Sequence, residues 1–266
     1  MMYRSVLQSR TILATRPGGI SEQLRESIKR QGGQVLHLPS IEIRPLIKSE
    51  SAEQLLRTLI EFDVLIFVSK NAVKYAGYLM ADIVGQAREK TILAIGSGTY
   101  KELLGLGFDE VGYTDGNTGS EALLGIDELQ QENVRNKRIM IVRGQGGREL
   151  LGDKLIARGA HIQYVELYLR AKPQIEAVQI KNLWRVDKPD AVLATSAEGL
   201  KNLLEMTAEE ERFLFLNTRL VVISPRLKDI AEAMGFSAEI KVAKGYSDDD
   251  FMVALMQMFE AHNDER

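Results

Sequence analysis

The feature that most limits how this chain can fold is an internal repeat with a spacing of about 127 residues. Arg16 and Arg143 each follow a short apolar run directly, and they lie 127 positions apart. The same spacing, or one residue more, relates further pairs: Glu22 and Glu149, Leu24 and Leu151, Gly32 and Gly159, Val64–Ser69 and Ala191–Ser196, Ile92–Ile95 and Leu220–Ile223, and Gly107-Phe108 and Gly235-Phe236. Matches that keep one order over most of a chain indicate duplication.

Each copy is predicted to contain a strand, a helix and a strand, followed by two further strand–helix steps. The first copy opens with a strand at 11–15, a turn at 16–19, a helix near 21–31 and a strand at 34–38. The corresponding segments of the second copy are 138–142, 143–147, 148–158 and 161–165. The strands are unbroken apolar runs, which is typical of a parallel sheet covered by helices on both faces. We therefore predict an α/β protein with two similar doubly wound parallel-sheet domains.

Two further extended pieces are predicted as linker strands between these domains. They are PSIEIRP at 39–45 and ELYLRAKP at 166–173, and each is bracketed by proline or charge. The alternative is that they are ordinary strands at a sheet edge, where proline is tolerated.

Composition narrows the class of protein. Of 266 residues, 45% are hydrophobic and 27% are charged, as in globular proteins with a core, and the net charge is −3. That charge argues against general nucleic-acid binding, and the absence of cysteine excludes disulfides and thiolate metal sites. The apolar runs are too short for a signal peptide or a membrane span, so we expect a soluble, cytoplasmic protein with no nucleic-acid or membrane partner.

The candidate binding residues lie in the predicted strand-to-helix turns. In doubly wound sheets, ligands bind at the carboxyl ends of the strands, where helix N-termini attract anions. Two such domains facing each other would line a cleft suited to a ligand with many carboxylates or phosphates. The candidate residues are Arg16, Ser69, Asn71, Ser97, Gly98, Thr99, Arg143, Ser196, Ala197, Ser224 and Arg226.

Helix capping is an alternative explanation for each hydroxyl residue in these turns, and the two roles are compatible. The arginines at positions 16 and 143 are more informative, because an arginine directly after an apolar strand is poorly placed for packing. Arg226 either meets a carboxylate of the ligand or is a solvated residue at a helix start.

Tyr168 has no tyrosine counterpart in the other copy, where Ser40 or Ile41 corresponds to it. Its phenol can donate or accept a proton, so Tyr168 is a candidate catalytic residue. The alternative is an aromatic residue that covers the domain junction.

Motifs for cofactors and metals are not found. The glycines at 144–147 and 96–98 do not complete GxGxxG, and no phosphate-binding loop is present. His37, His161 and His262 are scattered, and Asp248-Asp249-Asp250 has the pattern of a solvated first helical turn. We expect no metal and no cofactor.

Taken together, the motifs resemble the uroporphyrinogen-III synthase family. The resemblance extends from about residue 10 to 258 and rests on these segments: ILATRPGG at 12–19, LIFVSKNAV at 65–73, AIGSGTYKEL at 94–103, IVRGQGGRELLGDKLIARGA at 141–160, VELYLR at 165–170 and AVLATSAEGLKNLL at 191–204. It implies an enzyme of haem and sirohaem biosynthesis that closes linear hydroxymethylbilane into uroporphyrinogen III. Ring D is inverted, water is lost and no cofactor is used. The substrate's acetate and propionate arms suit anion-binding turns.

The resemblance also implies residue roles and domain boundaries. A tyrosine at the position of Tyr168 is the candidate acid, and residues matching Ser69, Thr99 and Ser196 border the pocket. One domain would comprise 1–38 with 173–266 and the other 45–165, with 39–44 and 166–172 as linker strands. We expect a monomer that makes a transient contact with hydroxymethylbilane synthase.

Two rival functions remain open. One is a non-catalytic two-domain sensor of a small anionic ligand, which would share the same cleft. The other is an inactive paralogue, supported only by Ser224-Pro225-Arg226, where many family members have a Gly/Pro-Thr arrangement.

Overall fold

The computed structural model describes residues 5–46, 58–79, 82–87, 89–114, 119–245 and 247–260. His262 lies outside these residues. The chain divides into two compact units, one formed by Met1–Glu42 with Ala171–Arg266 and the other by Ile43–Arg170.

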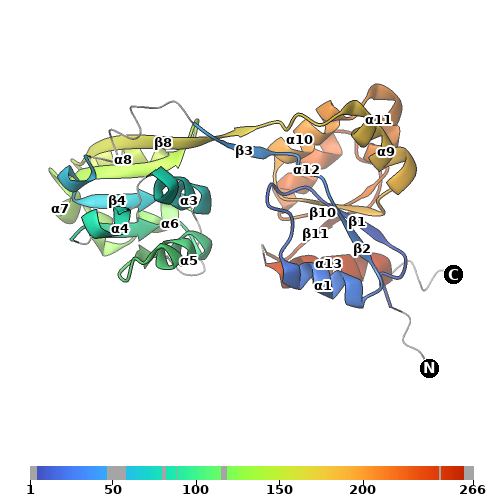
Figure 1. Ribbon diagram of the computed structural model, residues 1–266, viewed down its shortest axis with the longest axis horizontal. Coiled ribbons are helices and arrows are strands. Elements are labelled where there is room, and N and C mark those ends of the chain that lie inside the picture. The colour runs from blue at the N-terminus through green and yellow to red at the C-terminus, as the bar shows by residue number, and fades with distance from the viewer. Residues whose placement is uncertain are drawn as a thin grey trace. The chain divides into compact units, whose positions relative to one another are not determined.

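The first unit contains a parallel five-stranded sheet. Its strands lie in the order β11 (Ile240–Val242), β10 (Arg219–Val222), β9 (Ala191–Ala194), β1 (Thr11–Ala14) and β2 (Gln34–His37). The helices of this unit are α1 (Glu22–Arg30), α9 (Ala177–Asn182), the π-helical turn η3 (Leu183–Asp187), α10 (Ala197–Met206), α11 (Glu209–Leu216), α12 (Pro225–Ala233) and α13 (Asp248–Glu260). Figure 1 shows both units.

The second unit contains a six-stranded sheet. The order is β3 (Glu42–Pro45), β8 (His161–Ala171), β7 (Arg138–Gly144), β4 (Val64–Phe67), β5 (Thr91–Ala94) and β6 (Gly112–Tyr113). Its helical segments are η1 (Leu59–Glu61), α3 (Lys70–Leu79), α4 (Ile83–Gln86), α5 (Ser97–Leu106), α6 (Ser120–Leu123), η2 (Asp127–Leu129), α7 (Gln131–Val134) and α8 (Leu150–Ala157). The strands from β8 to β6 pair in parallel.

The two sheets share one strand order, as the repeat in the sequence requires. Strands β2, β1, β9, β10 and β11 correspond in sequence spacing and in position to β8, β7, β4, β5 and β6. The predicted duplication and α/β fold class are therefore confirmed. The matched strand pairs β1 and β7, and β9 and β4, begin 127 residues apart.

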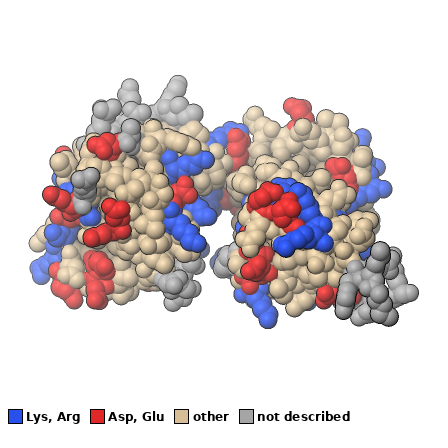
Figure 2. Space-filling view, turned by 60° about the horizontal axis from the view of Figure 1, so that its bottom comes forward, with Lys and Arg blue, Asp and Glu red and all other residues tan. Residues whose placement is uncertain are grey.

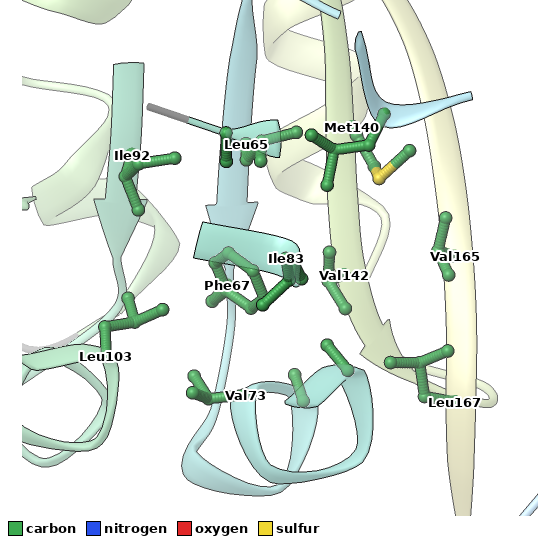
Figure 3. Close-up of a cluster of buried hydrophobic side chains, with 14 of the residues drawn as sticks. Leu65, Phe67, Val73, Ile83, Ile92, Leu103, Met140, Val142, Val165 and Leu167 are labelled. Carbon is green, nitrogen blue, oxygen red and sulfur yellow. The ribbon is translucent and has the colours of Figure 1, made fainter. Parts of the chain in front are cut away.

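Both faces of each sheet are buried, which explains the unbroken apolar runs. In β4, Leu65 and Phe67 join a core with helices α3, α4 and α5, whereas Val64 and Ile66 join a separate core with α6, α7 and α8. Figure 3 shows the first of these cores. The first unit has the same two-sided arrangement, with α9 to α12 on one face and α1 with α13 on the other.

Strand β8 is longer than the strand predicted at 161–165, because it continues through the extended piece that follows. The separately predicted piece at 166–173 is thus largely the second half of one strand. β3, the other predicted linker strand, lies beside β8 at the edge of this sheet.

Three elements, η3 and the short outer strands β6 and β11, have no counterpart among the predicted segments. Trp184 of η3 is buried against Phe215 of α11, with 5.0 Å between the ring centroids. Among the described helices, none combines the length and the apolar composition needed to cross a membrane.

Candidate active site

The carboxyl edge of the six-stranded sheet brings together side chains from four strand ends. Strands β8, β7, β4 and β5 are parallel neighbours, so their carboxyl ends meet at the same edge. Gly144 ends β7, Tyr168 is paired with it in β8, and Ser69 and Ser97 follow β4 and β5. These residues are far apart in the sequence and adjacent in the sheet.

Tyr168 is 4% exposed, and its phenol oxygen lies 2.8 Å from Oγ of Ser69. Its ring stacks on Tyr75 of α3, with centroids 5.9 Å apart. Its carbonyl accepts a hydrogen bond of 2.7 Å from the backbone N–H of Gln145. The phenol is therefore held from several sides at the edge where a ligand is expected.

Ser69 also acts as the N-cap of α3. Its Oγ accepts a hydrogen bond of 3.1 Å from the backbone N–H of Ala72, so the predicted capping role and the contact with Tyr168 occur together. Asn71 lies in the first turn of the same helix and is half-buried.

The turn after β5 begins α5 and contains three predicted site residues. Gly96 has a positive φ of 79°, Ser97 is exposed and Thr99 is 4% exposed. The side chain of Lys70 lies where a Cβ on Gly98 would be, which links this turn to the start of α3. A cation thus lies between the two helix starts.

Arg143 is 7% exposed, and other protein groups hold its guanidinium. Nη2 lies 2.9 Å from the Glu166 carboxylate, and Nη1 donates to the carbonyl oxygens of Gly147 and Arg148 at 3.1 and 3.4 Å. The guanidinium also lies 3.9 Å from the centroid of the Tyr164 ring. These contacts shape the loop after β7.

Tyr164 lies on β8, beneath the Arg143 guanidinium, and is packed against α8. Its hydroxyl occupies the space that a Cβ on Gly152 would need. Burial raises the pKa of Tyr164, and the positive charge of Arg143 partly opposes that shift.

The carboxyl edge of the five-stranded sheet carries the remaining candidates. Arg16 follows β1, and its guanidinium lies 4.8 Å from the ring centroid of Phe251 on α13. Burial lowers the pKa of Arg16, and the Asp248 carboxylate opposes that shift. The carbonyl of Arg16 lies 2.9 Å from Nε2 of His37, which ends β2.

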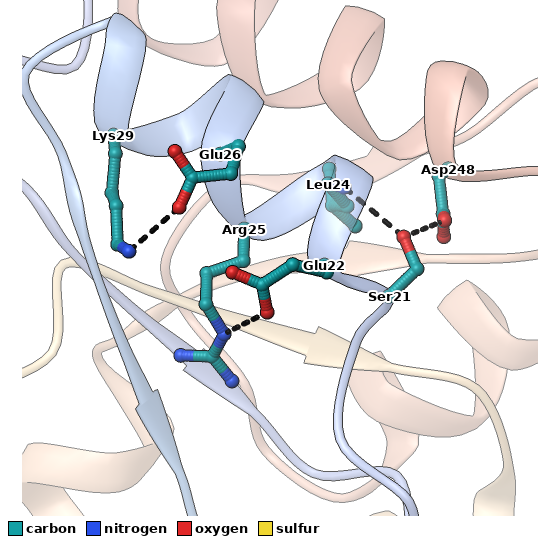
Figure 4. A network of polar contacts seen from close by, with 7 residues as sticks. All are labelled: Ser21, Glu22, Leu24, Arg25, Glu26, Lys29 and Asp248. Atoms are coloured by element: carbon teal, nitrogen blue, oxygen red, sulfur yellow. Dashed lines mark hydrogen bonds and ion pairs between the residues drawn. The ribbon is translucent and has the colours of Figure 1, made fainter.

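Asp248 lies with Asp249 and Asp250 in the first turn of α13, as predicted, and it also connects two helix starts. Its carboxylate accepts a hydrogen bond from Ser21, the N-cap of α1, whose Oγ also accepts from the backbone N–H of Leu24 at 3.0 Å (Figure 4). Asp248 thus faces both Ser21 and Arg16.

Ser196 and Ser224 are the N-caps of α10 and α12 in the same unit. Their Oγ atoms accept hydrogen bonds from Gly199 and Leu227 at 3.0 and 3.3 Å. Ala197 begins α10 and is half-buried, whereas Arg226 is exposed in the first turn of α12.

The structure thus divides the predicted residues between two sheet edges. Ser69, Asn71, Ser97, Gly98, Thr99, Arg143 and Tyr168 belong to the second unit, and Arg16, Ser196, Ala197, Ser224 and Arg226 to the first. Four further residues contact these side chains and were not predicted as site residues: Tyr75, Gly144, Lys70 and Glu166. Of these four, only Gly144 could have been predicted as a site residue from its neighbours in the sequence, because it directly follows the arginine at the end of a predicted strand.

No group of three or more His, Asp or Glu side chains that could hold a metal ion is found among the described residues. Two hollows of about 480 and 590 Å³ lie near the amino ends of β4 and β5, around Asp63, Lys90 and Glu128. Their lysines have protein partners: Lys90 donates to the carbonyl of Ile60 at 2.7 Å, and Lys137 pairs with Asp63 at 3.2 Å. Both hollows lie at the amino edge of the sheet, opposite the carboxyl edge that carries Tyr168.

On the face that Figure 2 shows, acidic and basic side chains are interspersed in both units. This agrees with the nearly balanced composition of 34 basic and 37 acidic residues.

Comparison with known proteins shows one family over nearly the whole chain. The family model described as uroporphyrinogen-III synthase HemD matches residues 22–252. Uroporphyrinogen-III synthase of Escherichia coli (strain K12) is 34% identical over 248 residues, covering 92% of this chain and 99% of that protein. The enzyme of the same name from Proteus mirabilis is 33% identical over 196 residues, covering 73% and 97%.

Solved structures show a related fold. Uroporphyrinogen-III synthetase from Helicobacter pylori 26695 matches with a TM-score of 0.62 at 15% identity, covering 97% of this chain and all of that one. A mutant uroporphyrinogen III synthase from Thermus thermophilus matches with a TM-score of 0.56 at 16% identity, again covering 97% of this chain and all of that one. At these identities the likeness concerns the fold.

Proposed function

Because this chain belongs to the uroporphyrinogen-III synthase family, we propose that it closes hydroxymethylbilane into uroporphyrinogen III in tetrapyrrole biosynthesis. The reaction inverts ring D and releases water. The observation that carries this function is the 34% identity to the Escherichia coli enzyme over 92% of the chain.

In the proposed mechanism, Tyr168 is the acid for the first step. Its phenolic proton passes to the hydroxyl group of the substrate's hydroxymethyl carbon. The carbon–oxygen bond then breaks, and the oxygen leaves with the bonding electron pair as water. The resulting azafulvenium cation is attacked by the bridged α-carbon of ring D, which gives a spiro intermediate. The bond from that carbon to its original methylene bridge then breaks, and the methylene carbon bonds to the other α-carbon of ring D. The macrocycle finally loses a proton as the pyrrole regains aromaticity, and that proton balances the one given by the phenol. The burial of Tyr168 and its contact with Ser69 support this role.

The carboxylate arms of the substrate are proposed to bind at helix N-termini. In the second unit these are the starts of α3 and α5, with Ser69, Asn71, Ser97, Gly98 and Thr99. Backbone N–H groups and the helix dipole favour anions at such positions. In the first unit the proposed contacts are Arg16, Ser196, Ala197, Ser224 and Arg226. Since protein groups hold the guanidinium of Arg143, its contribution is to shape the loop after β7.

We also propose the domain boundaries inferred from the family resemblance, with the segments 39–44 and 166–172 as linker strands. The enzyme is further proposed to act as a cytoplasmic monomer that contacts hydroxymethylbilane synthase transiently. Light scattering on the purified chain tests whether it is a monomer, and a dimer mass would contradict that statement.

An isomer assay tests the function. The purified chain is supplied with hydroxymethylbilane made in situ, and the products are oxidised to porphyrins and separated by chromatography. We expect the type III isomer, whereas the spontaneous reaction gives type I. Production of the type I isomer alone, at the rate of the protein-free control, would contradict the proposal.

A further inference from the structure

We propose that Gly144 is a positioning residue for Tyr168, because the absence of a side chain at 144 provides the space for the phenol ring. This inference rests on the proposed function for its catalytic consequence. The juxtaposition itself comes from the sheet register and from the contacts around the ring.

The first observation is the close approach of the two residues. A Cβ placed on Gly144 would lie 2.5 Å from Cε2 and 2.6 Å from Cζ of Tyr168. Carbon atoms in contact lie at about 3.5 to 4.0 Å. Any side chain at 144 would therefore have to move the ring, and the affected carbons include Cζ, which carries the hydroxyl group.

The second observation is that the backbone does not require a glycine at this position. Gly146, two residues later, has a positive φ of 69°, whereas Gly144 is not among the positive-φ residues. An alanine at 144 would fit the backbone and would conflict with the neighbouring ring. This separates the role of Gly144 from that of a turn glycine.

The third observation is a β-bulge that aligns the two residues. Arg143 pairs with Glu166, but Gly144 pairs with Tyr168, so β8 contains one extra residue between these pairs. Leu167 and Tyr168 are consecutive, yet both pack into the same hydrophobic core, whereas neighbouring side chains of a regular strand point to opposite faces. Bulges re-aim side chains in this way.

Two further contacts restrict the ring away from Gly144. Tyr75 stacks on it, and the hydroxyl of Tyr75 donates to the carbonyl of Ile43 at 3.3 Å. Ser69 contacts the phenol oxygen while its own oxygen accepts from Ala72. With Ser69 as the donor to the phenol oxygen, the phenolic hydrogen is left for the substrate.

The duplication provides an internal comparison. At the spacing of 127 residues, Pro17 corresponds to Gly144 and Ile41 to Tyr168. Ser196 corresponds to Ser69 and keeps the helix cap. In that unit, Ser40 lies beside Gly199 and donates to the carbonyl of Thr15 at 3.3 Å. The serine N-cap is therefore common to both copies, whereas the pair of Gly144 and Tyr168 is found only in the second unit.

The test compares Gly144→Ala with Gly105→Ala as the matched control. Gly105 lies in α5, and a Cβ there would meet no heavy atom within 4 Å. We expect Gly144→Ala to lower kcat at least about tenfold, since a displacement of about 1 Å can cost about a hundredfold. KM should change less than kcat, and Gly105→Ala should match the wild type.

A double-mutant cycle with Tyr168→Phe shows whether Gly144 acts through the tyrosine. If it does, Gly144→Ala combined with Tyr168→Phe is no slower than Tyr168→Phe alone, within about twofold. The proposal would be overturned if the double variant lost kcat by the product of the two single losses. It would also be overturned if Gly144→Ala kept the wild-type kcat. If Gly144→Ala fails to fold, adding Tyr168→Leu should restore folding, and failure of that pair to fold would also overturn it.

A spectroscopic readout separates this inference from the proposed function. In protein labelled with ¹³C at the tyrosine rings, the Tyr168 resonance is assigned by its loss in Tyr168→Phe. It should shift in Gly144→Ala and stay in place in Gly105→Ala. An unshifted resonance overturns the positioning role, whereas a wild-type protein that makes no type III isomer overturns the function alone.

Discussion

At the scale of single residues, Tyr164 and Tyr168 of β8 show how neighbouring groups set the chemistry of a side chain. The phenol of Tyr164 is packed against α8 beneath Arg143, and burial raises its pKa. The phenol of Tyr168 instead contacts a serine hydroxyl at the sheet edge where a ligand is expected. Of the two, Tyr168 is the one proposed as the acid.

Replacing Tyr168 by Phe removes the proposed acid and keeps the ring. We expect kcat to fall by about a hundredfold, the lower end of the range for a general acid, with unchanged circular dichroism. Tyr164→Phe is the control and should retain turnover. Isomer formation by the two variants is measured side by side, and equal rates would remove Tyr168 from the mechanism.

Asp63 predicts a pH dependence of stability. Its carboxylate accepts hydrogen bonds from the backbone N–H of Arg138 at 2.8 Å and from Lys137 at 3.2 Å, which lower its pKa. A folded-state pKa below the unfolded value of about 3.9 means that the carboxylate stabilises the fold above about pH 4. That contribution is lost as pH falls through the folded-state pKa.

Asp63→Asn should therefore weaken the acid dependence of the free energy of unfolding below about pH 4. The effect is modest, because the Asp63 side chain is 40% exposed and screened by solvent. Urea titrations at several pH values measure it. An acid slope equal to that of the wild type would contradict the prediction.

At the scale of elements, the π-helical turn η3 depends on a buried polar contact. Nε1 of Trp184 donates to Oγ1 of Thr207 at 3.0 Å, and that hydroxyl donates to the carbonyl of Leu203 at 2.8 Å. Both side chains are at most 2% exposed. The contact joins η3 to the end of α10.

Thr207→Val keeps the shape of the side chain but leaves the Trp184 N–H without this acceptor. A buried unsatisfied donor costs about 1–3 kcal/mol, so we expect a loss of stability in that range. The chain contains one tryptophan, so its fluorescence reports the site directly during denaturation. Thr207→Ser keeps the hydroxyl and should lose less stability than Thr207→Val. Equal losses of stability in the two variants would show that packing, and not the hydrogen bond, dominates.

At the scale of the whole molecule, the two units share a strand order, and each presents helix N-termini at the carboxyl edge of its sheet. A polycarboxylate bound by these groups stabilises the folded chain by linkage. At a ligand concentration of about 100 Kd, the stabilisation is about 2.7 kcal/mol. Such a gain is measurable as a rise in Tm.

We therefore expect uroporphyrinogen III to raise Tm and acetate at the same carboxylate concentration to leave it unchanged. The rise should shrink with added salt, because salt screens exposed charges. Differential scanning fluorimetry under anaerobic conditions measures both. An equal rise with acetate would indicate a general ionic effect instead of a site.

Much of this architecture was predictable from local sequence. Unbroken apolar strands such as Val64–Phe67 indicate a sheet buried on both faces, and the 127-residue spacing indicates two copies of one plan. The candidate residues at strand ends followed from the same reasoning, since parallel strands end at a common edge. These features depend on residue type, period and order, which are properties of the chain itself.

Contacts between distant segments depended on the tertiary structure. Ser69 and Tyr168 were both selected from sequence, but their hydrogen bond spans 99 residues and depends on which strands are neighbours. The bulge in β8 places Tyr168 opposite Gly144, and no local pattern shows that shift of register. Apolar periodicity therefore determined the elements and their order, whereas the partner of each side chain was decided by packing and strand register, which exist only in the folded chain.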